Sequence, residues 1–139
     1  MTINLRSALL LALTIAFVPE TLRANESKLA VTISGPETLT RAAHTSIPVL
    51  ITLPPDTADL RELPLALTPH IDGTAIELVR GRLLRADAKV EATGQLRFLI
   101  PVVAHSEGTA ILRVELMTYT CDPRCRRLDA SGTRVLRVR

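Results

Sequence analysis

The chain has 139 residues, 47% of them hydrophobic, yet it contains only two Phe, one Tyr and no Trp. It is too short for a large α/β barrel or for a dinucleotide domain with an attached substrate domain, but it is long enough for one domain with an aliphatic core. The net charge is only +3. Because aromatic side chains for base stacking are scarce, we expect no nucleic-acid binding.

The N-terminal segment, residues 1–24, has the three-part layout of a secretory signal peptide. A short start with one positive charge precedes an apolar run from Ala8 to Val18, and residues 19–24 form a polar exit. The run of about 11 residues is well short of the roughly 20 that a membrane-spanning helix needs, so we expect no stable membrane anchor. Cleavage after Ala24 leaves residues 25–139 as one domain, which we expect to be periplasmic or secreted.

The mature chain alternates apolar and polar residues with a period of two, which predicts half-buried strands. Pro69 is expected to end one strand before a turn over 70–73, residues 105–108 form another turn, and Ser131-Gly132 is expected to precede the last strand. The residues that we expect to face the core are Leu29, Val31, Ile33, Ile47, Val49, Ile51, Leu53, Leu63, Leu65, Leu67, Leu96, Phe98, Ile100, Val102, Leu112, Val114, Leu116, Leu136 and Val138.

The middle of the chain is less regular. Residues 74–85 predict one or two further strands, and 82–89 could form a helical turn. Pro48, Pro64 and Pro101 lie in or beside strand runs, which places them at edges, strand starts or bulges. About seven strands separated by Pro and Gly turns predict an all-β fold, an antiparallel sandwich of immunoglobulin-like type.

Six arginines lie in residues 124–139. We interpret them as a solvated strand face and a charged sheet edge that resists aggregation, with an anion-binding patch as the alternative.

The only two cysteines, Cys121 and Cys125, lie four residues apart. In an exported chain we expect them to form a disulfide with each other, across a turn at Asp122-Pro123-Arg124. So short a loop stabilises by about 2 kcal/mol on the chain-entropy model. A local, exposed bridge tends to exchange more easily than one between distant strands, and nearby arginines favour a thiolate over a thiol. Both a redox role and a structural role are therefore open.

The C-terminal third resembles a family of exported redox domains. From Gly94 to Arg139 the order is a strand, a turn, a long strand ending in Tyr119-x-Cys121, a short loop, Cys125 and a closing strand. This order is similar to the C-terminal part of the N-terminal domain of the thiol:disulfide reductase DsbD and of related sandwich domains. The resemblance implies an immunoglobulin-like fold in which Cys121 and Cys125 exchange disulfides with an exported partner such as a thioredoxin-like protein. Tyr119 and Arg124 would support the pair, and no cofactor is required.

Two alternatives to this thiol-disulfide oxidoreductase function stay open. In the first, the bridge only shapes a loop of a non-catalytic binding or accessory module, which recognises its partner through strand edges or the arginine-rich end. In the second, Cys-x-x-x-Cys resembles the Cu(I) motif of the Sco family of copper-delivery proteins, with Met117 as a third soft ligand. That family's motif begins a helix of a thioredoxin fold, whereas this one follows a strand.

Hydrolytic chemistry finds little support in the sequence. The three histidines are far apart, and the chain lacks the His-Glu-x-x-His and Gly-x-Ser-x-Gly motifs. A triad of Ser106, His44 and Asp72 would require the tertiary structure to assemble it.

Overall fold

The computed structural model describes residues 29–54, 64–121 and 124–139, so the predicted signal peptide lies outside the described residues. No helix in these three ranges has the length and apolar character needed to cross a membrane. The elements in chain order are β1 (Ala30–Ile33), β2 (Thr38–Leu39), β3 (His44–Thr52), β4 (Leu65–Asp72), β5 (Ile76–Leu78), β6 (Leu83–Leu84), the 3-10 helix η2 (Arg85–Asp87), β7 (Lys89–Val90), β8 (Leu96–Ala104), β9 (Gly108–Cys121) and β10 (Cys125–Val138).

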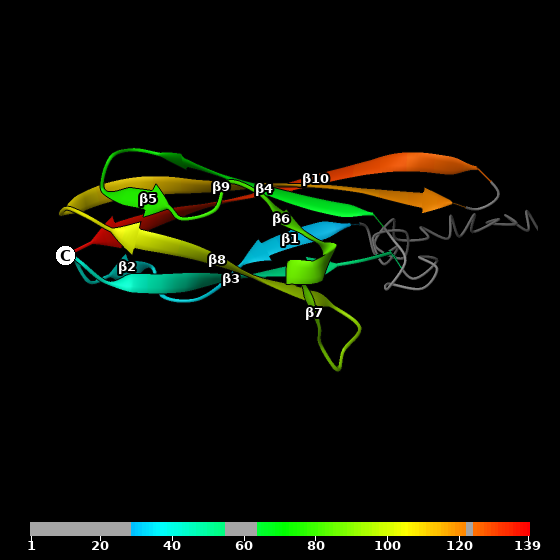
Figure 1. Ribbon diagram of the computed structural model, residues 1–139, viewed down its shortest axis with the longest axis horizontal. Helices are drawn as coiled ribbons and strands as arrows, with labels where there is room; N and C mark the ends of the chain where they lie inside the picture. Colours follow the sequence, from blue (N-terminus) through cyan, green and yellow to red (C-terminus); the bar gives the residue numbers. More distant parts are fainter. Residues whose placement is uncertain (1–28, 55–63, 122–123) are drawn as a thin grey trace, which may run out of the picture.

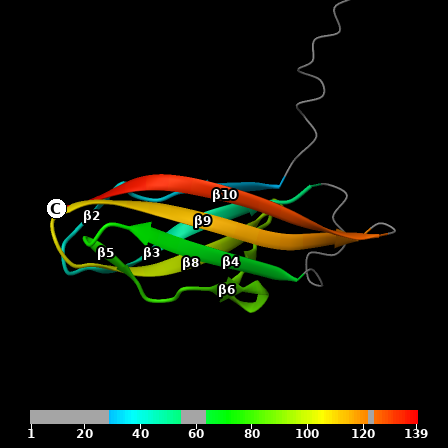
Figure 2. The same cartoon turned by 90° about the horizontal axis from the view of Figure 1, so that it is seen from above.

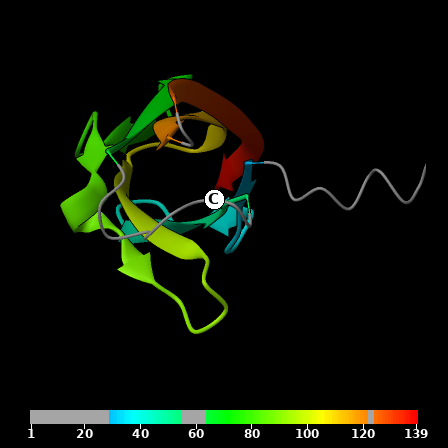
Figure 3. The same cartoon turned by 90° about the vertical axis from the view of Figure 1, so that its right-hand side faces the viewer.

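The strands form two sheets that pack face to face and curl around a common interior (Figures 1 and 3). One sheet has the order β1-β3-β8-β5, with β7 also paired to β8, and the other has the order β2-β10-β9-β4-β6. Every pairing is antiparallel except that of β2 with β10. This arrangement is an immunoglobulin-like sandwich and confirms the predicted fold class. The described residues contain ten strands rather than about seven. Strands β5 and β6 lie within residues 74–85, where one or two strands were predicted, whereas the two-residue strands β2 and β7 are too short to show an alternating pattern.

The core is aliphatic and lies between the two sheets. Among the described residues, Phe98 is the one aromatic side chain of this core, and it is fully buried on β8. Four of the residues predicted to face the core are only partly buried but pack against it, namely Leu29, Val31, Ile33 and Leu53. Leu63 lies outside the described residues. The remaining predicted inward residues are all buried, which confirms the period-two interpretation of the strands.

Two predicted strand boundaries are wrong. Strand β4 does not stop at Pro69 but continues to Asp72, so the turn begins only at Gly73, where φ is +118°. Pro69 lies opposite Val114, beyond the two β4 residues that pair with β6. Because β9 is the only strand paired with β4 at that point in the described ranges, the strand tolerates a residue without an amide donor.

The predicted start of the last strand after Ser131-Gly132 is also wrong, because β10 runs without interruption from Cys125 to Val138. Position 132 favours glycine because a side chain has little room there, not because the chain turns. A Cβ at this position would lie 3.1 Å from the Val31 carbonyl oxygen and 3.2 Å from a Val31 methyl carbon. A glycine inside a strand therefore marks the place where β1 lies close against β10.

The other local predictions agree with the structure. Pro64 directly precedes β4, while Pro48 and Pro101 lie one residue beyond the points where β1 and β5 stop pairing with their neighbours. Each proline is thus at a strand start or a locally edge-like position. The predicted helical turn is η2.

The chain passes from one sheet to the other between β1 and β2, and Arg134 of β10 holds this crossing. Its guanidinium donates hydrogen bonds to the carbonyl oxygens of Ile33 at 2.9 Å and Gly35 at 2.6 Å. Gly35 has φ +92°, a conformation that favours glycine. Only 19% of the Arg134 side chain is exposed. This arginine of the C-terminal cluster therefore has a structural role, contrary to its predicted place on a solvated face.

Candidate functional site

The candidate site is the outer end of the β9–β10 hairpin. Among the described residues, strand β4 pairs with β9 only as far as Leu65 opposite Thr118, and β1 lies against β10 near Gly132 and Arg134. Residues 119–121 of β9 and 125–127 of β10 therefore extend beyond the neighbouring described strands as a two-stranded ribbon, visible in Figure 1 at the end of the molecule opposite the C-terminus. The buried Thr118 anchors its base, since its hydroxyl donates a 2.9 Å hydrogen bond to the Pro64 carbonyl oxygen.

A disulfide closes this ribbon. Cys121 and Cys125 are bonded, as the sequence predicted, and they form the last pair of the β9–β10 register. Both residues are exposed, and their Cα atoms are 3.8 Å apart. The predicted turn falls on residues 122–123, outside the described residues, while Arg124 is exposed directly before Cys125. The bridge therefore lies at the surface, away from the sandwich core.

The residues predicted to support the pair lie beside it. Tyr119 is two residues from Cys121, so the two side chains are on the same, outer face of β9, and Tyr119 is opposite Arg127 of β10. Tyr119 is half-buried. Met117, on the same face, is opposite Asp129, and the Arg127 Nε lies 3.0 Å from an Asp129 carboxylate oxygen. This ion pair was not predicted from the sequence. The available signal was the spacing, because residues two apart on a strand lie on the same face.

The arrangement places two exposed, bonded cysteines at the surface, with Arg124 and Arg126 next to Cys125 in the chain. Such a bridge is open to attack by a thiolate. Coordination of Cu(I) by the Cys-x-x-x-Cys motif would first require reduction of the bridge, because thiolates are the ligands. Met117 is half-buried on the face that carries Cys121. The described residues contain no group of three His, Cys, Asp or Glu side chains placed to hold a metal ion.

A depression of about 410 Å³ lies on the same outer face, across β4, β9 and β10. Ala66 and Met117 contribute apolar surface, and Arg82, Arg127 and Asp129 contribute charges of both signs. These opposite charges do not select one class of ligand.

The possible triad is not assembled. His44 begins β3, Asp72 ends β4, and Ser106 lies in the turn before β9. In the part of the chain that the structure describes, no hydrogen bond or ion pair joins any two of them.

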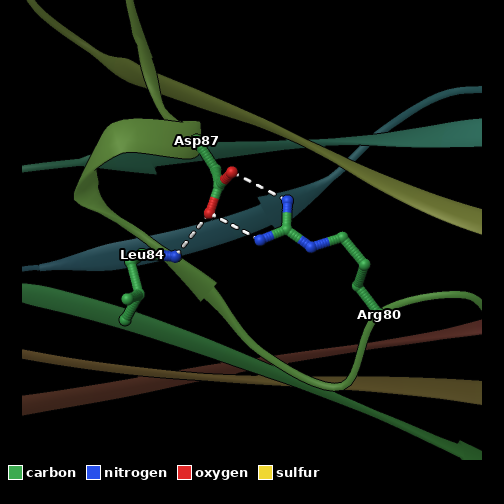
Figure 4. Close-up of polar contacts among 3 residues, drawn as sticks. All are labelled: Arg80, Leu84 and Asp87. Carbon is green, nitrogen blue, oxygen red and sulfur yellow. Dashed lines mark hydrogen bonds and ion pairs between the residues drawn. The ribbon is translucent and has the colours of Figure 1, made fainter.

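A second polar cluster, not predicted from the sequence, lies around η2 (Figure 4). Arg80 donates to both carboxylate oxygens of Asp87, at 2.7 and 3.1 Å, and the Leu84 amide donates to Asp87 at 2.9 Å. The Arg80 hydrogen bonds, followed by that of the Leu84 amide, hold the pKa of Asp87 below its usual value, and Asp87 raises the pKa of Arg80. The cluster fixes the connection between β6 and β7.

Comparison with known proteins yields structural similarity only. No protein-family model matches the chain, and no curated protein matches it. Among solved structures, a cohesin module from a Clostridium perfringens ATCC13124 family 33 glycoside hydrolase has a TM-score of 0.42 and 12% identity, covering 79% of this chain and 96% of the module. Murine CRIg has a TM-score of 0.43 and 15% identity, covering 78% of this chain and 98% of its own.

Proposed function

We propose that the protein is exported to the periplasm or secreted and takes part in thiol-disulfide exchange with a protein partner through Cys121 and Cys125. The observation that carries this proposal is the position of the bridge. It joins the two cysteines of the chain at the exposed end of a projecting ribbon, where another protein can reach both sulfurs.

The chemistry of the site supports this function. The bridge closes a loop between residues only four apart, so it contributes about 2 kcal/mol on the chain-entropy model, about half of what a bridge across a long loop contributes. Arg124 and Arg126 flank Cys125 and stabilise negative charge on a released thiolate. The resemblance to the N-terminal domain of DsbD supports the same function and suggests a thioredoxin-like partner.

The exchange needs no cofactor. A thiolate of the partner attacks one sulfur of the bridge, which forms a mixed disulfide and releases the other cysteine as a thiolate that takes up a proton. A second partner thiol then attacks the partner's sulfur in the mixed disulfide, which leaves a partner disulfide and two thiols at Cys121 and Cys125. Two electrons pass from the partner dithiol to the bridge, and the reverse sequence oxidises the partner.

The second candidate is a binding or accessory module in which the bridge is structural. It is favoured by the ribbon itself, because residues 119–121 and 125–127 have no third described strand beside them and isolated two-stranded ribbons are marginally stable. In that case the disulfide keeps the ribbon paired and available for contact with a partner. A Cu(I) site formed by the reduced pair and Met117 is a third possibility, and it requires the bridge to open.

The redox equilibrium of the purified protein against glutathione buffers distinguishes the first two candidates, with free thiols read by mass after alkylation. A potential above about −230 mV supports exchange and justifies trapping partners with Cys121→Ser and Cys125→Ser. A potential below about −300 mV contradicts the exchange function and supports the structural role of the bridge. Titration of the reduced protein with Cu(I), with Met117→Leu as the control variant, tests the third.

A further inference from the structure

Among the described strands, the outer half of β10 is paired on one side only. Strand β9 pairs with β10 along its whole length, whereas on the other side β2 pairs only with Arg137 and Val138. Strand β1 lies against β10 near Gly132. Residues 125–130 therefore have no strand on their second side in the described part of the chain, and Figure 2 shows this stretch of β10 along the margin of the sheet.

The backbone direction along this edge follows from two separate observations. The Arg137 amide donates to the Glu37 carbonyl oxygen at 2.8 Å, on the side away from β9. Because successive residues of a strand alternate in direction, the odd-numbered residues of β10 point their N–H and C=O groups outward. The Arg139 amide agrees, since it donates to the Leu39 carbonyl oxygen at 3.0 Å on the same side.

Cys125, Arg127 and Asp129 thus present backbone donors and acceptors to the open edge. Further along the same edge, the odd-numbered residues already pair with another strand. The amides of Arg137 and Arg139 both donate to carbonyl oxygens of the β2 segment. The outer half of β10 continues this established pairing surface.

From this geometry we infer that the open edge of β10 pairs with the same edge of a second copy of the chain, as an antiparallel two-fold dimer centred on Leu128. In this register Arg127 lies opposite Asp129 of the second copy, and Asp129 lies opposite Arg127 of the second copy. Both pairs use outward-pointing residues, as an antiparallel ladder requires. Leu128 meets its own symmetry mate, which adds an apolar contact.

The charges select this register over its neighbours. If one strand slides by one residue relative to the other, odd-numbered residues lie opposite even-numbered ones. The even-numbered residues point their backbone groups toward β9, so the ladder hydrogen bonds between the two copies are lost. If the two-fold axis instead passes through Arg127, the two copies of Arg127 lie opposite each other. If it passes through Asp129, the two copies of Asp129 lie opposite each other. Like charges directly opposite each other are unfavourable, whereas opposite charges are favourable. Arg127 and Asp129 are both exposed, with 59% and 60% of their side chains accessible, so they can reach the new partners.

Analytical ultracentrifugation of the oxidised protein over a concentration series up to about 1 mM tests this dimer. The unmodified protein should show a reversible monomer–dimer equilibrium. Arg127→Asp and Asp129→Arg, each alone, place like charges at both junctions and should weaken self-association by about tenfold or more. Mixed in equal amounts, these two variants should form a heterodimer, because the two acidic side chains of one variant then face the two basic side chains of the other.

A matched control is Arg126→Asp, which makes the same charge change as Arg127→Asp but lies opposite Ala130 of the second copy. It should weaken the dimer much less than Arg127→Asp. Amide exchange adds a backbone readout, since the Arg127 and Asp129 amides should exchange more slowly at high than at low concentration, with little change at Leu128.

A monomer at every concentration overturns the inference, as does a dimer that both single charge reversals leave intact. Equal loss in Arg126→Asp and Arg127→Asp means that net charge and not register governs association, which also overturns it. A mixture of the two reversed variants that fails to associate refutes the proposed register even if the unmodified chain dimerises. None of these outcomes depends on the reduction potential of the disulfide, so they are separate from the test of the proposed function.

Discussion

Replacing Arg134 with methionine tests the idea that this side chain holds the crossing between the two sheets. Methionine keeps an unbranched apolar stem but is shorter and lacks the guanidinium. The change deletes the hydrogen bonds to the Ile33 and Gly35 carbonyls, at 2.9 and 2.6 Å. The longer contact to the Glu37 carboxylate, 3.9 Å with a side chain that is 79% exposed, is expected to contribute little.

The magnitude follows from these contacts. Hydrogen bonds that involve a charged group contribute about 1.5–3 kcal/mol each, with the lower end appropriate where water can replace the donor. The Ile33 bond is part-buried and the Gly35 bond is exposed. We therefore expect Arg134→Met to lower the free energy of unfolding by about 2–3 kcal/mol. Arg134→Lys should lose about half as much, because an ammonium cannot make both bonds in the fork geometry of a guanidinium.

The assay is urea unfolding of the oxidised protein, with Arg113→Met as the matched control. Arg113 lies on the outer face of β9 with 49% of its side chain exposed, and its contact to Glu115 is 3.9 Å long, so its replacement should change stability by less than about 0.5 kcal/mol. A local readout is the Arg137 amide, which donates to Glu37 in the crossing segment. Its hydrogen exchange should accelerate in Arg134→Met more than the exchange of the β8 amides.

If Arg134→Met costs no more than Arg113→Met, the guanidinium does not hold the crossing, and the reasoning from its two hydrogen bonds is refuted. Unchanged exchange at Arg137 combined with a large global loss would also contradict it, because the effect would then not originate at the β1–β2 connection.

Three further predictions concern other parts of the fold. Gly132→Ala should lower the free energy of unfolding by about 1 kcal/mol in urea titration, because its Cβ meets a β1 carbonyl oxygen at 3.1 Å; a gain in stability would show that β1 moves away freely. Cys121→Ser/Cys125→Ser should cost about 2 kcal/mol by the same method, and a loss near 5 kcal/mol would mean that the bridge stabilises far more than its short loop. Asp87 should titrate below its usual pKa in carbon-detected NMR, and because the folded-state pKa is lowered, its stabilising contribution is present above the ordinary carboxyl pKa and lost as the pH falls through the folded value. Arg80→Gln should return the Asp87 midpoint toward 3.8, and a midpoint that stays low would assign the shift to the backbone amide instead.

The candidate site was partly predictable. The pairing of Cys121 with Cys125 followed from their being the only cysteines, four residues apart in a chain with a predicted signal peptide. The period-two pattern placed Tyr119 and Cys121 on one face. The sequence could not show that β4 and β1 end before the ribbon does, because pairing length is set by which strands become neighbours. The projection of the site is therefore a tertiary result.

Local sequence pattern was enough to predict the alternation of buried and exposed residues in the long strands, the all-β class and the turn at 105–108. These are local properties, because a strand must place successive side chains on opposite faces and the apolar face must be buried. The roles of Pro69, Gly132 and Arg134 emerged only from the packing of the strands. Each reads locally as a strand end, a turn or a solvated charge. Pro69 is tolerated because β4 has a paired strand on only one side at that point in the described residues. Gly132 is needed where β1 lies close against β10, and Arg134 binds two carbonyl oxygens about 100 residues away in the chain.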